Sequence, residues 1–246
     1  CLYNPYISEI IPEIEKRYIS YGLESEASLT AKGVHLEGMG SHFEVLSEGK
    51  SLGLFGMTMP GMHNVSNSLA AIAVGIELGI DIEVIKNALI EFSGVERRFQ
   101  VKGKVEGIIF VDDYGHHPTE IRATLLAAKA GLGRRLVVLF QPHRYTRTRD
   151  LLSEFFNAFD QADRVIITDI YPAGENPING ISSSLICEGI KERGHRDVAY
   201  ISDREAILKD LGENLRSGDI FLTLGAGDVW KIGEELLRLK MEELVR

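Results

Sequence analysis

Hydrophobic and polar residues alternate along the first part of the chain. Three short runs, at residues 17–21, 41–46 and 51–55, place apolar side chains at about every second position and are separated by glycines and polar pairs. A period of two is the pattern of a β-strand with one buried face. It predicts antiparallel strands joined by hairpins, and the Ser-Glu-Gly-Lys stretch at 47–50 suits a tight turn between two of them.

Two helices are predicted after these strands. Residues 64–78 are rich in Ala and Leu, and residues 81–91 form a second helical segment for which Asp81 is a suitable N-cap. The helical pattern breaks in the stretch Ser-Gly-Val-Glu-Arg-Arg-Phe at 93–99. We therefore predict a domain boundary between residues 94 and 95.

Strand-like and helix-like segments alternate from there to the end of the chain. Such alternation requires crossover connections, which are right-handed and bury a mostly parallel sheet between helices. The second domain, residues 95–246, is therefore predicted to be an α/β, Rossmann-like, doubly wound domain. The predicted strands are 107–111, 135–140, 164–169, 198–201 and 220–224, and the helices that follow them are 118–130, 150–158, 182–193, 204–211 and 228–240.

Composition excludes several classes of protein. With 246 residues and 44% hydrophobic residues, the chain can bury a core and form two domains. A net charge of -9 and the lack of a dense Lys/Arg run argue against nucleic acid as a partner. The apolar stretches are strand-sized and no leader pattern is present, so we expect neither a membrane span nor a secretory signal. Cys1 and Cys187 form no disulfide framework, which fits a reducing cytoplasm.

A polar cluster follows the first predicted strand of the second domain. Asp112, Asp113, Tyr114, His116 and His117 stand within six consecutive residues. Pro118 favours an extended backbone before it and starts a helix, so this segment should be an exposed loop at the sheet edge. The residues could merely cap the helix or lie on the surface, but their number exceeds what a cap requires. We predict a functional loop, since loops at such edges often carry function.

A second polar cluster follows the next predicted strand. Arg144, Arg147 and Arg149 lie in the run Phe-Gln-Pro-His-Arg-Tyr-Thr-Arg-Thr-Arg-Asp at 140–150. They could form a solvated helix-start face, yet the start of a helix normally favours acidic residues. Arginines there suit an incoming carboxylate or phosphate, which they grip through paired, charge-assisted hydrogen bonds.

Two further motifs carry weaker signals. Leu-Gly-Ala-Gly-Asp at 224–228 could cradle a pyrophosphate, but the third glycine and the later acidic residue of the dinucleotide fingerprint are missing, so a tight turn is expected. Asn64 and Asn67 precede or begin the Ala-rich helix, and an Asn amide can pair with the N6 and N7 edge of adenine. Taken alone, this second motif is better explained as a helix cap.

Three motifs, taken together and in this order, resemble a known family. They are Gly61-x-His-Asn-x-x-Asn67, Gly94-Val-x-Arg-Arg98-Phe and Asp113-Tyr-Gly-His116-x-Pro118. In them the chain resembles the Mur ligases, the ATP-dependent amide-forming enzymes of peptidoglycan synthesis. Runs at 116–120, 140–147, 171–175 and 225–228 are similar to those of the members that add L-alanine to UDP-N-acetylmuramate. The resemblance covers essentially the whole chain.

The resemblance implies which residues bind the nucleotide. Asn64 and Asn67 match positions that contact adenine, and Asp113 matches an acidic residue near the ribose. Arg98 matches a hinge arginine that reaches the ATP phosphates. Phosphoryl transfer requires charge neutralisation, which an arginine can supply.

The resemblance also implies residues for the other substrates. Tyr114, His116, Arg144 and Arg147 match positions that line the amino-acid and muramate side of the site. Arg98 and His116 are the two residues expected to act in catalysis. The implied reaction forms an acyl phosphate from the muramoyl carboxylate and ATP, which the amine of L-alanine then attacks.

Parts of the family's fold are not found in this sequence. It contains no Gly-x-x-x-x-Gly-Lys-Ser/Thr loop for the ATP phosphates, no upstream Glu and His for Mg²⁺, and no domain for the UDP group. We therefore expect residues 1–94 to be the trailing part of a central ATP-binding domain and residues 95–246 to be the carboxy-terminal domain. The chain begins at Cys1 without an initiator Met and is expected to be a fragment, inactive without the missing segments.

Three alternatives stay open at this point. The chain could derive from the ligase that recycles a tripeptide onto UDP-N-acetylmuramate, although the run at 140–147 favours alanine addition. It could be a non-catalytic interaction or regulatory module on the same scaffold. Asp113, His116, His117 and His143 could form a metal site, but the Cys and His spacings of structural zinc sites are absent, and no metal ligand is assigned.

Overall fold

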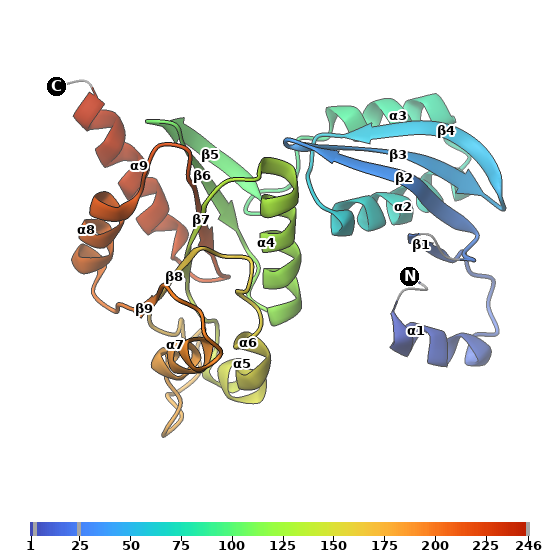
Figure 1. Cartoon of the computed structure of the whole chain (residues 1–246). Helices are drawn as coiled ribbons and strands as arrows, with labels where there is room; N and C mark the ends of the chain where they lie inside the picture. Colours follow the sequence, from blue (N-terminus) through green and yellow to red (C-terminus); the bar gives the residue numbers. More distant parts are fainter. Residues whose placement is uncertain (2–3, 24–25, 245–246) are drawn as a thin grey trace. The chain divides into compact units, whose positions relative to one another are not determined.

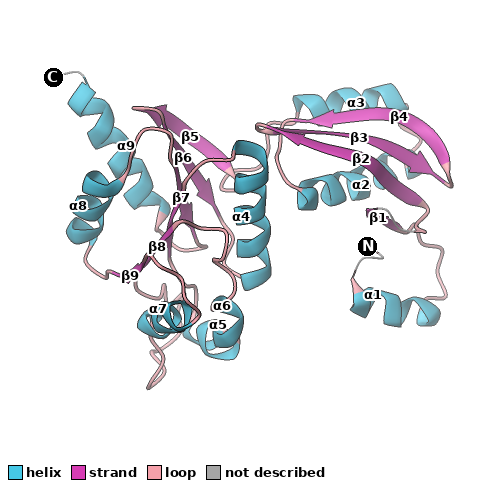
Figure 2. Cartoon of the chain, in the orientation of Figure 1, coloured by secondary structure: helices cyan, strands magenta, loops and turns pink. Residues whose placement is uncertain are grey.

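The structure is a computed structural model, which describes residue 1, residues 4–23 and residues 26–244. The chain forms two compact units, one made mostly of Cys1–Gly94 and one made mostly of the residues that follow. Figure 1 colours the chain along its sequence, and Figure 2 distinguishes helices from strands. Within the described ranges, no helix is long and apolar enough to cross a membrane.

The first unit contains a four-stranded sheet with the order β1-β2-β3-β4. β3 pairs antiparallel with β2 and β4, and the β3–β4 pair confirms the hairpin predicted from the runs at 41–46 and 51–55. Glu48 and Gly49 both have positive φ, 47° and 77°, and form the two-residue turn predicted between β3 and β4. The strands are β1 (Tyr21–Leu23), β2 (Leu29–Glu37), β3 (Gly40–Ser47) and β4 (Lys50–Met57), preceded by α1 (Pro5–Ile10) and a 3-10 turn at Ile11–Glu13.

Two features of this sheet differ from the prediction. The strand predicted at 17–21 begins only at Tyr21, and β1 pairs parallel, not antiparallel, with β2. β2 itself does not appear in the sequence pattern. Its register shifts between Lys32 and His35, and such a bulge interrupts the alternation on which strand prediction depends.

Both predicted helices of the first unit are present. α2 (Met62–Glu77) buries Val65, Leu69 and Ile72 against the sheet residues of the same core. α3 (Ile82–Glu91) starts at the predicted N-cap, because the Asp81 side chain accepts a hydrogen bond from the Glu83 amide at 2.8 Å. In the sheet, Phe43 and Phe55 face each other in register and stack within this core.

The second unit contains a six-stranded sheet with the order β5-β6-β10-β7-β8-β9. β6, β10, β7, β8 and β9 run parallel, and only the edge strand β5 is antiparallel. The strands are β5 (Gln100–Val105), β6 (Ile108–Asp113), β7 (Leu136–Phe140), β8 (Arg164–Ile167), β9 (Val198–Tyr200) and β10 (Ile220–Leu224). The predicted doubly wound, Rossmann-like α/β fold is confirmed.

Helices cover both faces of this sheet. α8 and α9 pack on one face through a buried cluster that includes Ile207, Leu211 and Leu236, and α4 lies on the other face in Figure 1. β10 comes last in the chain yet lies between β6 and β7, so it joins the two halves of the sheet. The helices are α4 (Pro118–Leu132), α5 (Tyr145–Asp150), α6 (Leu152–Phe155), α7 (Ser183–Glu192), α8 (Arg204–Asn214) and α9 (Trp230–Leu244).

The helix predicted at 150–158 is wrong. The structure has two short helices instead, α5 ending at Asp150 and α6 spanning Leu152–Phe155. Leu151 separates them with φ -113° and ψ 19°, outside the helical range. β5 is a further difference, since its Gln-Val-Lys-Gly-Lys-Val sequence is too polar and too irregular to stand out as a strand.

Candidate functional site

The carboxyl ends of four parallel strands meet at one edge of the second sheet. β6, β10, β7 and β8 are neighbours in this order and run in the same direction. The loops that follow them therefore lie side by side, where open α/β sheets bind their ligands. The residues predicted to be functional at 112–117 and 143–147 lie in or next to the loops after β6 and β7.

A buried carboxylate anchors the loop after β6. Asp113 is 4% exposed, and it accepts hydrogen bonds from the amides of Gly115 at 2.7 Å and Phe99 at 2.8 Å, and from the Thr124 hydroxyl at 3.3 Å. Burial raises the pKa of this carboxyl, and the two amide bonds and the charge of Arg98 oppose the rise. The role visible for Asp113 is to fix the loop backbone, and its contact with a ribose stays a prediction.

Glu120 and His117 cap the helix that follows. Glu120 Oε2 accepts from the amides of His116 at 3.1 Å and His117 at 3.2 Å, while His117 Nδ1 accepts from the Thr119 amide. This reciprocal arrangement is a capping box. Burial would raise the pKa of Glu120, but the two amide bonds and the neighbouring charges of His116 and Arg98 lower it overall. His117 therefore caps the helix, which is the alternative that the sequence analysis gave to a functional role.

His116 has one ring nitrogen engaged with the backbone. Its Nδ1 lies 3.0 Å from the Tyr114 carbonyl oxygen, which can only accept. Nδ1 therefore carries a proton, and Nε2 is the nitrogen left to exchange one. The Glu120 carboxylate lies 3.6 Å from Nδ1. This second group orients the imidazole further, in the way that a base is usually held by its neighbour.

Four aromatic rings form a row across the loops that follow β6, β7 and β8. The Tyr114 and His116 rings meet edge to face at 5.6 Å, His116 and His143 lie 5.5 Å apart, and His143 stacks on Tyr171 at 5.7 Å. The residues come from the loops after β6, β7 and β8. The sequence suggested His143 only as a possible metal ligand and gave Tyr171 no role of its own, because only the strand order brings these loops together.

Arg147 is held by His143. Its Nη1 donates to the His143 carbonyl oxygen at 3.1 Å and lies 3.1 Å from His143 Nδ1. Since a guanidinium cannot accept a hydrogen bond, Nδ1 is the acceptor and His143 is neutral. Burial, together with the positive charges of His116, Arg147 and Arg144, lowers the pKa of His143 from 6.5 to about 4.

We expect His143 to stay neutral throughout the physiological range. Its folded-state pKa is about 4 against 6.5 for the ordinary group, so the unfolded chain binds the extra proton between these values. The stability that neutral His143 contributes is present above pH 6.5 and is lost as the pH falls towards 4. Imidazole resonances followed by NMR, assigned with His143→Gln, should show a midpoint near 4. A midpoint near 6.5 would contradict the half-buried, Arg147-bonded geometry of His143.

The loop after β8 accepts hydrogen bonds from the first turn of α5. Glu175 accepts from the Thr146 amide at 3.0 Å and the Thr146 hydroxyl at 2.6 Å, so it caps the start of this short helix. These bonds are the main cause that lowers the pKa of Glu175. Arg144 lies 4.0 Å from the same carboxylate, and its amide donates to the Tyr171 carbonyl. The motif at 171–175 therefore positions the arginine loop.

The arginines are placed differently from the prediction. Arg144 is the N-cap of α5, with φ 74°, and Arg147 is the third residue of this six-residue helix, whose last turn holds both Arg147 and Arg149. Cations near a helix C-terminus are favourable, so the argument from an unusual helix start does not apply to Arg149. Arg149 is exposed and pairs with Asp150 at 2.7 Å, whereas Arg147 turns back to His143.

Arg98 is available for a ligand. Half of its side chain is exposed (49%), its guanidinium lies 5.9 Å from the Tyr114 ring centre, and Nη1 makes a long contact of 3.7 Å with Glu120. By contrast, the side chain of the preceding residue, Arg97, is only 22% exposed. Arg98, which matches the family's phosphate contact, is therefore more exposed than Arg97.

The glycine motif after β10 forms a tight turn, as expected. Gly225 has φ 146°, and a Cβ there would lie 2.7 Å from the Gln141 carbonyl oxygen. A Cβ on Gly227 would lie 2.2 Å from Gln141 Oε1. Gln141 Oε1 also accepts from the amides of Asp228 and Val229, so the loops after β7 and β10 meet closely through this side chain.

The two asparagines of the first unit differ in exposure. Asn64 is buried in α2, and its Nδ2 donates to the Pro60 carbonyl oxygen at 2.8 Å, which fixes the turn before the helix. Asn67 lies on the exposed side of the same helix. Asn67 is thus the better placed of the two for a ligand, and both adenine contacts stay predictions.

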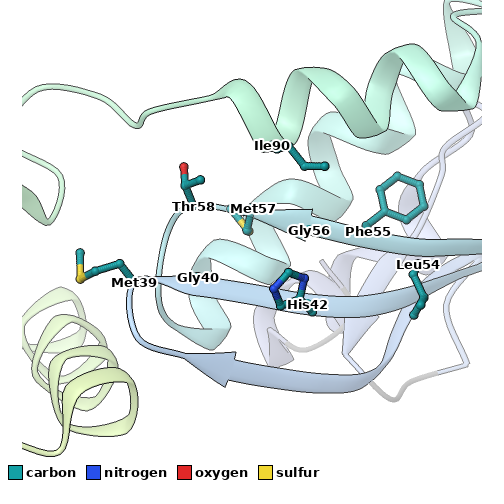
Figure 3. Close-up of a pocket in the computed structure, with 9 residues that line it drawn as sticks. All are labelled: Met39, Gly40, His42, Leu54, Phe55, Gly56, Met57, Thr58 and Ile90. Carbon is teal, nitrogen blue, oxygen red and sulfur yellow. The ribbon is translucent and has the colours of Figure 1, made fainter.

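The first unit also has a surface groove of about 630 Å³ (Figure 3). Its lining is almost entirely apolar, with the His42 ring as the main polar group. None of the residues predicted to bind a substrate lines it. The lining residues are Met39, Gly40, His42, Leu54, Phe55, Gly56, Met57, Thr58 and Ile90.

The residues considered for a metal site have other partners. Asp113 and His117 hold backbone amides, and His143 Nδ1 accepts from Arg147. Over residues 1, 4–23 and 26–244, no group of three or more His, Cys, Asp or Glu side chains is arranged to hold a metal ion. The structure therefore offers no support for the metal-site alternative.

Residues 97–227, which include the loops after β6, β7 and β8, match the family described as Mur ligase, glutamate ligase domain. This match covers more than half of the chain. The chain belongs to the Mur ligase family. Residues 2–75 match the Mur ligase middle domain. The resemblance inferred from the three motifs is thereby confirmed.

Within the Mur ligase family, several curated relatives are similar over almost all of this chain. The UDP-N-acetylmuramate–L-alanine ligase of Geobacter sp. (strain M21) is 51% identical over 242 residues, which are 98% of this chain and 52% of the relative. The protein of the same name from Myxococcus xanthus (strain DK1622) is 45% identical over 239 residues, 97% of this chain and 51% of the relative. The chain spans about half the length of the curated relatives it matches.

Solved Mur ligase structures have the same fold. UDP-N-acetylmuramate-alanine ligase MurC from Thermotoga maritima has a TM-score of 0.79 and 28% identity, covering 92% of this chain and 48% of that chain. MurF ligase from the same organism, in complex with ADP, has a TM-score of 0.72 at 18% identity, covering 98% of this chain and 52% of that chain. The second likeness shows the fold alone.

Proposed function

We propose that the full-length protein is an ATP-dependent ligase that joins L-alanine to UDP-N-acetylmuramate. The observation that carries this proposal is the 51% identity, over 98% of the chain, to a ligase of that name. The loops after β6, β7 and β8 support it, because they bring Arg144, Arg147 and His116 to one sheet edge. A non-catalytic module would not require this arrangement.

Arg144 and Arg147 are the residues proposed to hold the substrate carboxylates. Within the described residues, the hydrogen bonds of the Arg147 side chain are those of Nη1 to His143, which leave Nη2 and Nε free to form a fork. Paired bonds of this kind match the geometry of a carboxylate. The ring row runs from Tyr114 through His116 to His143, which holds Arg147, and Tyr114 and His116 are proposed to line the same side of the site.

The proposed reaction has two steps. A muramoyl carboxylate oxygen attacks the γ-phosphorus of ATP, the bond to the bridging oxygen breaks, and ADP leaves. The amine of L-alanine then attacks the carbonyl carbon of the acyl phosphate, and inorganic phosphate leaves as the carbon–oxygen bond breaks. His116 Nε2 is the proposed acceptor of the proton that the amine loses, and Arg98 neutralises charge on the phosphoryl group.

We propose individual residues that contact ATP. Asn67 would contact adenine and Arg98 the phosphates, with Asn64 and Asp113 as the further candidates already described. Mg²⁺ is expected from the family, but the described residues do not offer a ligand set for it, and no step above depends on it. A cytoplasmic location is proposed as well, because the proposed reaction consumes ATP.

Substrate choice tests this proposal. The full-length protein, supplied with ATP and UDP-N-acetylmuramate, is expected to release phosphate with L-alanine as acceptor and to form a product of the corresponding mass. The tripeptide used by the recycling ligase should be a poor acceptor under the same conditions. Product formation with the tripeptide and not with L-alanine would refute the proposal in favour of the recycling enzyme. Phosphate release without either amide product would favour neither ligase.

A further inference from the structure

Arg97 makes three side-chain hydrogen bonds next to the site, although the motif analysis gave it no role. Its Nε donates to Asp112 Oδ2 at 2.9 Å, Nη2 to the Gly225 carbonyl oxygen at 2.6 Å, and Nη1 to the Gly227 carbonyl oxygen at 3.2 Å. All three guanidinium nitrogens are therefore used. They link the end of β6 to the glycine turn after β10.

Arg97 also contacts Tyr114 from two directions. Its guanidinium carbon lies 4.9 Å from the centre of the Tyr114 ring, and its carbonyl oxygen accepts from the Tyr114 amide at 2.6 Å. Tyr114 is one of the residues proposed to line the substrate side of the site. Its ring and its backbone are thus both fixed by the same arginine.

The backbone on both sides of Arg98 is strained. Arg97 has φ 59° and Phe99 has φ 47°, a left-handed conformation that non-glycine residues rarely adopt. The amide of Phe99 is held by Asp113, and the amide of Arg97 donates to Gln100 Oε1 at 3.1 Å. Arg98 therefore projects from a segment whose shape depends on bonds made by its neighbours.

We propose that Arg97 is a positioning residue that fixes the Tyr114 ring and the backbone of Arg98 for the substrates of the ligase. The inference rests on the proposed function for the identity of those substrates, but the positioning itself rests on the contacts above. Arg97 does not touch the reacting groups in this account. It acts through Arg98 and Tyr114.

Lysine is the informative replacement. It keeps the positive charge beside the buried Asp112 but cannot bond one carboxylate and two carbonyls at once, since those bonds need the planar fork. Arg97→Lys should therefore release the glycine turn and the Tyr114 ring without leaving a buried carboxylate unpaired, while the backbone bond from the Tyr114 amide remains.

The same domain offers a matched control at the opposite end of its sheet. Arg135 precedes β7, and its Nη1 donates to Asp219 Oδ2 at 2.8 Å and to the Asn214 carbonyl at 3.3 Å. Asp219 is as buried as Asp112, at 2% exposure each. Arg135→Lys thus removes an equivalent arginine–aspartate arrangement that lies far along the strands from the proposed site.

The first test of this inference does not depend on ligase activity. Hydrogen exchange of the full-length protein, followed by mass spectrometry, should become on the order of tenfold faster in peptides covering 112–117 and 225–229 for Arg97→Lys. For Arg135→Lys the change should fall instead in peptides around 134–136 and 214–220. Unchanged exchange at 112–117 in Arg97→Lys would overturn the inference. If that variant does not fold, Asp112→Asn weakens the same link more gently and should accelerate the same peptides.

The second test asks whether Arg97 acts through Arg98. A misplacement of about 1 Å can cost on the order of 100-fold in rate, so Arg97→Lys should lower kcat about 10- to 100-fold. In an Arg98→Ala background the same change should cost less than about threefold, because coupled residues are not additive. Arg135→Lys should leave kcat unchanged in both backgrounds. Full additivity of Arg97→Lys and Arg98→Ala would overturn the inference. A protein without ligase turnover would refute the proposed function, and the exchange result would still decide the role of Arg97.

Discussion

Arg98→Ala in the full-length protein is expected to lower kcat by about 100- to 1000-fold, the cost of removing one preorganised group that stabilises transition-state charge. Stability should hardly change, because half of the side chain is exposed and its contact with Glu120 is 3.7 Å long. Exposed substitutions of this kind usually change the free energy of unfolding by less than about 0.5 kcal/mol. Steady-state kinetics and thermal unfolding of the same preparations measure both quantities.

The comparison with Arg238→Ala controls for the loss of a surface arginine. Arg238 lies on α9, is exposed, and pairs with Glu242 at 2.7 Å. Its replacement should leave turnover unchanged. The KM for ATP in Arg98→Ala should rise less than kcat falls, since the arginine is proposed to act mainly in the transition state. A rise in the KM for ATP with kcat unchanged would contradict the assigned role.

Arg147→Lys is expected to raise the KM for L-alanine or for UDP-N-acetylmuramate about 10- to 100-fold. The lysine keeps the charge but cannot bond His143 and grip a carboxylate through a fork, and a hydrogen bond to a charged group contributes about 1.5 to 3 kcal/mol. The KM for ATP should barely change. Kinetics with each substrate varied in turn measure the three constants.

Arg149→Lys is the matched control for this prediction. Arg149 lies two residues further along α5, in the same last turn, but it is exposed and pairs with Asp150. Its replacement should leave all three constants within about twofold, as is usual for a surface charge. A defect of Arg147→Lys confined to the KM for ATP would refute the role assigned to Arg147.

Asn67→Ala is expected to give the reverse of Arg147→Lys, with weaker ATP binding and unchanged alanine binding.

The local sequence was sufficient to predict helices and strands that are determined by their own residues. β7 appears as an uninterrupted apolar run, and α4 begins at Pro118 with an acidic residue in its first turn. α5 could not be predicted in the same way. Its start is capped by Glu175, about 30 residues away in sequence, and that contact depends on the loop after β8.

The candidate site was likewise predictable only where its residues are neighbours in sequence. The loop after β6 could be recognised because its polar residues are consecutive. The residues that contact this loop could not be predicted, because β10 comes from the end of the chain and inserts between β6 and β7. That insertion brings the glycine turn to Arg97, and the order of β7 and β8 brings Tyr171 to His143. Neither contact has a signature in local sequence.

A crystal structure of the full-length protein with the product, UDP-N-acetylmuramoyl-L-alanine, tests the central claim most directly. The claim is that the loops after β6 and β7 of the carboxy-terminal domain bind the amino-acid end of the reaction. We predict the alanyl carboxylate within hydrogen-bond distance of Arg144 or Arg147, and the new amide nitrogen near His116 Nε2. A product whose alanyl end is bound away from Tyr114, His116, Arg144 and Arg147 would contradict the account.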